Sequence, residues 1–224
     1  MIWIIFIGLM IISFVISKSL QVKFQEYSKL PTEGLLSGKE VAEKMLRDFD
    51  IYDVQVVCTQ GTLSDHYNPT NKTVNLSKDV FEGHHVAAAA VAAHECGHAV
   101  QHARAYAWLQ MRSKMVPVVQ ITSKWVSWVL LAGILLIETF PRLLLIGIIM
   151  FGISTLFSFV TLPVEIDASS RALAWLNRNE ITSRETHPKA QKALRLAAYT
   201  YVVAALSSLA TLLYYVMIFM GRRD

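Results

Sequence analysis

The sequence predicts a mainly α-helical membrane protein in which four transmembrane helices carry a small α+β catalytic part. The first observation is composition: the 224-residue chain is 54% hydrophobic and 17% charged, which is too apolar for an ordinary soluble domain. The second is that its apolar residues are concentrated in four long runs. The third is the pentapeptide His94-Glu95-Cys96-Gly97-His98, an H-E-x-x-H motif that lies between the first two runs.

Each apolar run is about long enough to cross a hydrocarbon core of roughly 30 Å as a helix. The runs are residues 1–17, 115–137, 143–164 and 196–221. The first has no basic segment before it and no small-residue cleavage site after it, so we expect an uncleaved anchor and not a removed signal peptide. The second and third are separated only by residues 138–142, which include a proline and predict a tight helical hairpin.

Four spans place the two polar segments, residues 18–114 and 165–195, on the same side of the membrane. Lys and Arg are concentrated in these segments and near their ends, whereas the opposite side holds only Arg142, Arg222 and Arg223. The positive-inside rule therefore predicts a multi-pass protein of the plasma (inner) membrane, with the catalytic side in the cytoplasm and both termini outside. The net charge of +4 is not gathered into a basic cluster, so we expect no nucleic-acid partner.

The H-E-x-x-H motif predicts a metal site. In a helix, His94 and His98 lie one turn apart on the same face, and the Glu95 carboxylate lies beside the first imidazole. This spacing supplies two zinc ligands and a general base for a zinc-activated water. The surrounding residues are rich in alanine, so we expect one helix over about residues 84–114 and one zinc ion as the cofactor.

Zinc in a hydrolytic site typically takes a third protein ligand. Glu165 follows directly on the third apolar run, where a carboxylate is costly unless it is paired or binds a metal. We therefore favour Glu165 as the third ligand, and an interfacial carboxylate is the alternative. Asp167 can pair with Arg171 at i+4, or it can hydrogen-bond a ligand histidine and fix its tautomer; we favour the latter role.

The segment before the motif predicts a helix and two strands. Residues 33–50 have an amphipathic pattern, and Ser37 with Glu40 forms a capping-box pair. Residues 54–58 and 72–77 have the composition of short strands. We therefore expect a short β-hairpin or an edge strand just before the motif helix, where an extended substrate can pair.

A turn-rich loop, residues 61–71, connects the two predicted strands. His66 and Tyr67 in this loop are candidates for lining the catalytic cleft. The alternative for His66 is a solvated histidine in a turn.

Three stretches of the chain carry a resemblance to a known family. Ser64–Pro69, Val91–His102 and Leu162–Ser169 resemble the YugP-type family of neutral zinc metallopeptidases of bacterial membranes, and the resemblance covers essentially the whole chain. It implies a zincin-like catalytic part and an integral membrane zinc peptidase.

A more distant resemblance is to the HtpX-like and CAAX-prenyl endopeptidases, which are gluzincins. It implies that Glu165 is the third ligand. Ala168 matches the pattern of those proteases, but Ser169 stands where they have an aspartate, so the support of the ligands stays open between Asp167 and Ser169.

Those proteases also have a Thr-His-Pro after the third ligand, which Thr186-His187-Pro188 matches. The resemblance implies that His187 stabilises the oxyanion, with a loop histidine as the alternative. The arginine that those proteases have six places further on falls on Ala193 here, so the match is partial.

Together these patterns predict an integral membrane zinc endopeptidase. Its partners are the lipid bilayer and protein or peptide substrates, which are membrane proteins or their exposed segments. Glu95 is the predicted general base. The predicted oxyanion stabiliser is His187, with His66, Tyr67 and Arg171 as further candidates.

Two other classes of protein were considered. The first is a catalytically silent, zinc-stabilised membrane scaffold or chaperone subunit, which would need no base at Glu95. The second is a metal transporter, which would place histidines and acids within its spans. The four apolar runs lack such residues, and this argues against a transporter.

Overall fold

The computed structural model describes residues 2–61 and 64–221. Arg222 and Arg223, on which part of the orientation argument depends, lie outside the described residues, as does Met1 at the start of the first predicted span. The chain divides into two compact units, which are described separately. Unit 1 comprises Met1–Val15, Gln110–Pro163 and Thr200–Asp224, and unit 2 comprises Ile16–Leu109 and Val164–Tyr199.

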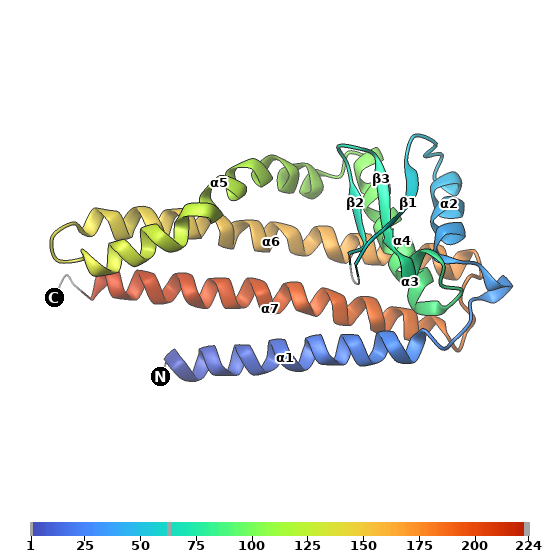
Figure 1. Ribbon diagram of the computed structural model, residues 1–224, viewed down its shortest axis with the longest axis horizontal. Coiled ribbons are helices and arrows are strands. Elements are labelled where there is room, and N and C mark those ends of the chain that lie inside the picture. The colour runs from blue at the N-terminus through green and yellow to red at the C-terminus, as the bar shows by residue number, and fades with distance from the viewer. Residues whose placement is uncertain (1, 62–63, 222–224) are drawn as a thin grey trace. The chain divides into compact units, whose positions relative to one another are not determined.

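Four long helices contain nearly all of the four predicted apolar runs, and each is long and apolar enough to cross a membrane. They are α1 (Ile2–Tyr27), α5 (Ala107–Leu135), α6 (Pro141–Arg178) and α7 (His187–Met220) (Figure 1). Each helix also includes polar residues at one end of its apolar run, after the run in α1 and α6 and before it in α5 and α7, because these residues are also compatible with a helix. At that end of each run the residues change from apolar to polar while the helix continues.

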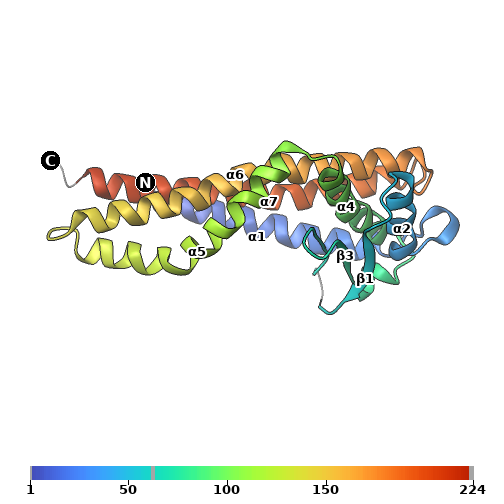
Figure 2. The same ribbon diagram turned by 90° about the horizontal axis from the view of Figure 1, so that it is seen from above.

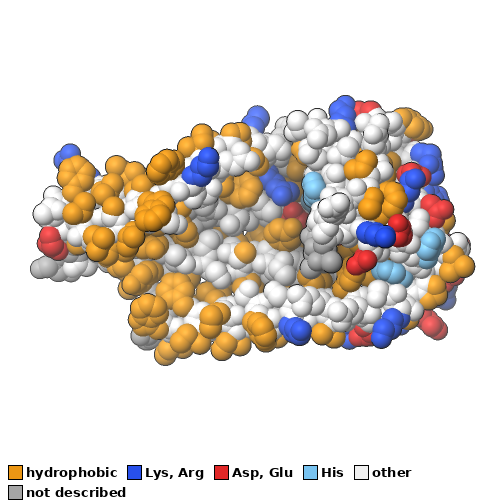
Figure 3. All heavy atoms as spheres, viewed as in Figure 1, with side chains coloured by type: hydrophobic (Ala, Val, Ile, Leu, Met, Phe, Trp, Pro, Cys, Tyr) orange, Lys and Arg blue, Asp and Glu red, His pale blue; other side chains and the backbone are white. Residues whose placement is uncertain are grey.

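Unit 1 contains the predicted helical hairpin. α5 ends at Leu135 and α6 begins at Pro141, whose missing N–H costs nothing at the first position of a helix. The two helices approach closely, because a Cβ at Gly133 would lie 2.6 Å from the Cα of Leu144. Many large apolar side chains of this unit are exposed, and they are frequent on the face seen in Figure 3, as a lipid environment favours.

Unit 2 contains helix α2 (Gly38–Asp48), which has the predicted capping box. The Ser37 hydroxyl accepts from the Glu40 N–H at 3.3 Å, and the Glu40 carboxylate accepts from the Ser37 N–H at 2.7 Å. The first residues of the predicted 33–50 helix instead form a 3-10 turn, Glu33–Leu35, in which Gly34 has a φ of 71°. The apolar stripe of α2 is buried against helix α4 (Val86–Ala103).

The sheet of unit 2 differs from the predicted hairpin. Strands β1 (Gln55–Thr59) and β3 (Thr73–Ser77) match the predicted strands, but they pair in parallel, with Gln55 opposite Thr73. A third strand, β2 (His66–Asn68), lies within the predicted loop and pairs antiparallel with β3. The order is β1-β3-β2, so β3 is central and β2 is the edge strand beside α4 (Figures 1 and 2).

Helix α4 carries the H-E-x-x-H motif and ends earlier than predicted. A short helix, α3 (Lys78–Phe81), precedes α4. The His85 ring caps the start of α4 by accepting a hydrogen bond from the Ala88 N–H. The predicted helix over 84–114 stops at Ala103, because Ala105 adopts a φ of 50°. The N–H groups of Ala105 and Tyr106 bond back to the carbonyls of His102 and Gln101, which is a Schellman motif without its usual glycine.

A close approach between α4 and α6 brings the motif to the third predicted ligand. A Cβ at Gly97 would lie 2.6 Å from the carbonyl oxygen of Ala168. Only glycine fits this contact, because the obstacle is backbone and cannot rotate away. Gly97 therefore sets how near the two helices lie.

We predict that Gly97→Ala lowers the stability of unit 2 by about 1–3 kcal/mol and weakens metal binding, because the added methyl group forces α4 away from α6. The measurement is thermal unfolding in detergent micelles, with and without zinc. Gly152→Ala is the matched control, because its Cβ would meet nothing nearer than a Leu212 methyl at 4.0 Å. An unchanged melting temperature with undiminished zinc binding in Gly97→Ala would contradict the prediction.

Candidate metal centre

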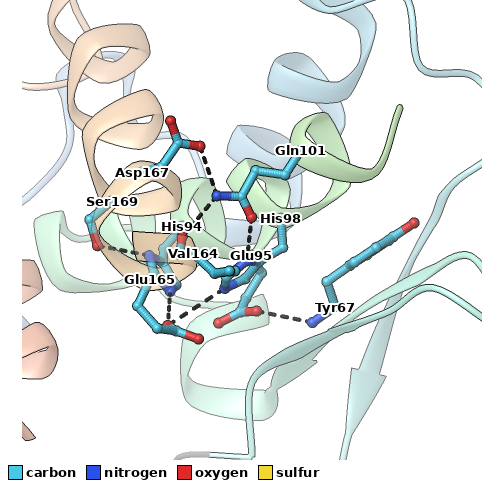
Figure 4. Close-up of polar contacts among 9 residues, drawn as sticks. All are labelled: Tyr67, His94, Glu95, His98, Gln101, Val164, Glu165, Asp167 and Ser169. Atoms are coloured by element: carbon cyan, nitrogen blue, oxygen red, sulfur yellow. Dashed lines mark hydrogen bonds and ion pairs between the residues drawn. The ribbon is translucent and has the colours of Figure 1, made fainter. Parts of the chain in front are cut away.

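The three residues predicted as metal ligands lie together in unit 2. His94 and His98 project from α4, and Glu165 projects from α6 (Figure 4). The Nε2 atoms of His94 and His98 lie 3.3 and 3.7 Å from the same Glu165 oxygen, and the three ligand atoms all lie within 4.8 Å of one another. Two atoms that each bind a tetrahedral zinc at about 2 Å are roughly 3.4 Å apart, so the donor set fits this ion.

The His94 ring is oriented by Ser169. Its Nδ1 lies 3.1 Å from the Ser169 hydroxyl, and its Nε2 faces Glu165 (Figure 4). A hydroxyl can accept from an Nδ1–H, which leaves the Nε2 lone pair for a metal. Of the two residues between which the support of the ligands was left open, Ser169 is the one that contacts the His94 ring.

The His98 ring is oriented by Gln101, a residue that the sequence did not single out. The Gln101 Oε1 lies 3.0 Å from His98 Nδ1, while its Nε2 donates to the Val164 carbonyl at 2.8 Å and to Asp167 at 2.7 Å. A carbonyl and a carboxylate only accept hydrogen bonds, so the amide group has one orientation and its oxygen faces the ring. His98 Nδ1 therefore carries the proton, and Nε2 is free to bind a metal.

Asp167 supports the site through Gln101, which lies between it and the His98 ring. Its carboxylate also pairs with Arg171 at 2.6 and 3.2 Å, as the i+4 spacing allows. The Arg171 guanidinium lies 5.8 Å from the ring centroid of Tyr106, at the start of the segment that follows α4. The pairing of Asp167 with Arg171 is thus present, whereas the favoured direct hydrogen bond to a ligand histidine is not, because Gln101 lies between Asp167 and the His98 ring.

The pKa of His98 is set by two opposing effects, its burial and the negative charges around it. Burial lowers the pKa of the imidazole, but the hydrogen bond to Glu165 and the charges of Glu95 and Glu165 outweigh it and raise the pKa above its usual value. A proton and a metal compete for the same Nε2 atom, and the negative surroundings attract either one.

Glu95 is held by the edge strand. Its carboxylate accepts a hydrogen bond from the backbone N–H of Tyr67 in β2 at 2.9 Å, and the residue is 8% exposed (Figure 4). The carboxylate thus lies between the free edge of the sheet and the ligand cluster.

The remaining candidates lie in other surroundings. The Tyr67 side chain points away from the ligands, and its hydroxyl lies 2.8 Å from His102 Nδ1 (Figure 4). His66 is exposed and contacts the Ser64 carbonyl. His187 begins α7, and its Nδ1 lies 2.9 Å from the Thr182 hydroxyl. The hydrogen bonds of these side chains go to residues outside the ligand cluster, so their catalytic roles stay predictions.

Cys96, within the motif, is a packing residue. It is fully buried, and its thiol lies 3.5 Å from the Ala42 carbonyl of α2. Burial raises the pKa of this thiol well above its usual value, which keeps it protonated and unreactive.

We predict that Ser169→Ala weakens zinc binding by about 10- to 100-fold, because the His94 ring loses the partner that orients it. The measurement is a zinc titration against a competing chelator, with the apo chain's melting temperature recorded in parallel. Ser170→Ala is the matched control, since Ser170 is the exposed neighbour on the same helix. Equal zinc affinity in the two variants would contradict a role for Ser169.

Comparison with known proteins agrees with this geometry. A family model described as "Putative neutral zinc metallopeptidase" matches residues 2–220. The "Putative membrane protease YugP" of Bacillus subtilis (strain 168) is 41% identical over 201 residues, which cover 90% of this chain and 88% of that protein. No solved structure matches. The chain therefore belongs to the neutral zinc metallopeptidase family, with zinc as its cofactor and His94, His98 and Glu165 as a cluster that can hold it.

Proposed function

We propose that the chain is an integral membrane zinc endopeptidase of the gluzincin type that cleaves membrane or membrane-proximal proteins. The observation that carries this proposal is the position of the Glu95 carboxylate, between the three-ligand cluster and the edge strand β2. A purely structural zinc site needs no carboxylate at this place, whereas a hydrolytic site requires one. The zincin-like arrangement of a motif helix beside an edge strand supports the same reading.

Glu95 acts as the general base. Zinc, when bound, polarises the scissile carbonyl and lowers the pKa of water. Glu95 takes the proton of the attacking water and delivers it to the leaving amine. The Tyr67 N–H holds the carboxylate in position before the reaction, so little reorganisation is needed when the proton moves.

Oxyanion stabilisation is proposed for His187, with His66, Tyr67 and Arg171 as further candidates. Arg171 is engaged by Asp167, and the Tyr67 hydroxyl is engaged by His102, so either would have to exchange a partner to reach a substrate. His187 contacts the neutral Thr182 hydroxyl. A hydrogen bond to a neutral group is weaker than one to a charged group, so His187 can exchange this partner for a substrate more easily than Arg171 can leave Asp167. These contacts support His187 as the first candidate.

We predict that Glu95→Gln retains zinc and loses peptide hydrolysis by at least about 100-fold, because the amide has no basic oxygen but the same shape. The measurement pairs zinc content with the rate of cleavage of a casein-like substrate by the purified chain in detergent. Cleavage at the wild-type rate would reject the mechanism. Loss of zinc together with activity would show that Glu95 supports the metal site, and would also reject the proposed division of roles.

The catalytic side is proposed to face the cytoplasm. The distribution of Lys and Arg supports this orientation, and the natural cysteines provide a test. Cys58 on β1 is exposed, whereas Cys96 is buried, so the catalytic unit offers one accessible thiol among the described residues.

We predict that a membrane-impermeant maleimide leaves Cys58 unlabelled in intact cells and labels it after the membrane is opened. Cys58→Ser, which retains only Cys96, measures the background. Labelling of wild-type chain in intact cells at the level seen after opening would place the catalytic unit outside.

A further inference from the structure

A cavity of unit 2 with apolar and polar walls lies next to the start of the edge strand β2. Its volume is about 550 Å³, which is within the usual range of ligand pockets. One wall is a single face of α1, formed by Leu20, Gln21, Phe24, Gln25 and Ser28. The other wall is formed by Asp65, Ser77, Asp79 and His85. None of these residues belongs to the ligand cluster.

The edge of β2 that does not pair with β3 leads from Glu95 toward this cavity. The Tyr67 N–H donates to Glu95 and so points away from β3, and the C=O of a strand residue points to the same side as its N–H. Asp65 directly precedes β2 and lies two residues from Tyr67 along the chain. A peptide paired along this edge therefore passes Glu95 and reaches Asp65 about 7 Å further on.

The cavity has a negative charge that its own residues do not neutralise. The Asp65 carboxylate is held by the N–H and hydroxyl of Ser77 at 2.7 and 3.0 Å, which are neutral donors. Asp79 is exposed. His85 Nδ1 accepts from the Ala88 N–H, so the ring is not doubly protonated, and burial lowers its pKa. Two carboxylates thus face a cavity without a cationic lining residue among those described.

The cavity also has an apolar part, which restricts the shape of its occupant. Leu20 and Phe24 lie on the α1 wall, opposite the acids. A lysine or arginine side chain combines an apolar stem with a cationic head, so the stem can lie against Leu20 and Phe24 while the head reaches the carboxylates. A free metal ion would not use the apolar wall, and an acidic side chain would be repelled.

We propose that this cavity is a substrate subsite that takes a lysine or arginine side chain about two or three residues from the scissile bond. This inference rests on the proposed peptidase function and adds a specificity to it. The cationic side chain is recognised by Asp79 and Asp65, and the α1 face supplies the apolar contact. Helix α1 then contributes to substrate selection with the residues that follow Lys18.

The first test uses the zinc-loaded full-length chain in detergent and a mixed peptide library, with cleavage sites identified by mass spectrometry. Wild type is expected to enrich Lys and Arg at one position near the cleaved bond. Asp79→Asn should lower that enrichment by about fivefold, and Asp79→Lys should replace it with a preference for acids. Glu82→Gln removes the same charge from an exposed residue outside the cavity and should leave the preference unchanged. Cleavage without basic enrichment, or enrichment that survives both Asp79 variants, overturns the proposal.

A second test does not depend on hydrolysis. Two blocked hexapeptides that differ only in one residue, lysine or norleucine, are titrated calorimetrically against zinc-loaded Glu95→Gln chain. The lysine peptide should bind about fivefold more tightly, and this difference should vanish in the Glu95→Gln, Asp79→Asn double variant. Equal binding of the two peptides, or no measurable binding of either, rejects the subsite. If wild type hydrolyses nothing but the lysine preference in binding is present, the peptidase function fails while the subsite stands.

Discussion

The close contact between α4 and α6 is the constraint on which the metal centre depends. Gly97 lies against the backbone of Ala168, and this permits Glu165 to reach the two imidazoles of the motif. Gln101 reinforces the contact from the α4 side, because its amide donates to the Val164 carbonyl and to Asp167 of α6. A fully buried amide that lost these partners would cost about 1–3 kcal/mol per unsatisfied group, so the contact has one favoured geometry. The site is thus a property of a helix pair, not of the motif alone.

Each ligand imidazole has its own partner on Nδ1, and the two partners are chemically different. His94 faces a serine hydroxyl of α6, and His98 faces the amide oxygen of Gln101 on its own helix. Both arrangements direct Nε2 toward the Glu165 carboxylate, whose desolvation is offset by the two rings and, when bound, by the metal. The chain of contacts continues through Asp167 and Arg171 to Tyr106, just beyond the Schellman turn that ends α4. The support of the metal ligands is thereby connected to the end of the motif helix.

Local patterns predicted the helical elements well and the sheet incompletely. The four apolar runs, the Ser37–Glu40 capping box and the two strands flanking the loop were all visible as periodicity or as a short motif. The strand β2 has only three residues, two of them next to turn-forming residues, and its pairing partner β3 lies beyond the turn. β2 is an edge strand because β1 pairs in parallel with the other side of β3. That pairing joins segments far apart in the chain, so no sequence pattern within the loop predicts it. Gln101 was missed for a similar reason, because a single buried amide has no periodic signature.

By itself the sequence determined the chemistry of the centre: the H-E-x-x-H spacing supplies two imidazoles and a carboxylate on one turn, and Glu165 follows an apolar run, where a carboxylate needs a partner. The first follows from helix geometry and the second from the cost of burying a charge. Both can be read from residues that are close together in the sequence. Only the tertiary structure decided that Ser169 orients His94, that Gln101 orients His98, and that the Tyr67 backbone holds Glu95. The first and third contacts join segments tens of residues apart, and the second, within α4, has its orientation fixed by Val164 and Asp167 of α6. All three therefore depend on how near two helices lie or on which strand forms the edge. Both are set by the packing of backbone against backbone at Gly97 and by strand pairing, which no local sequence pattern specifies.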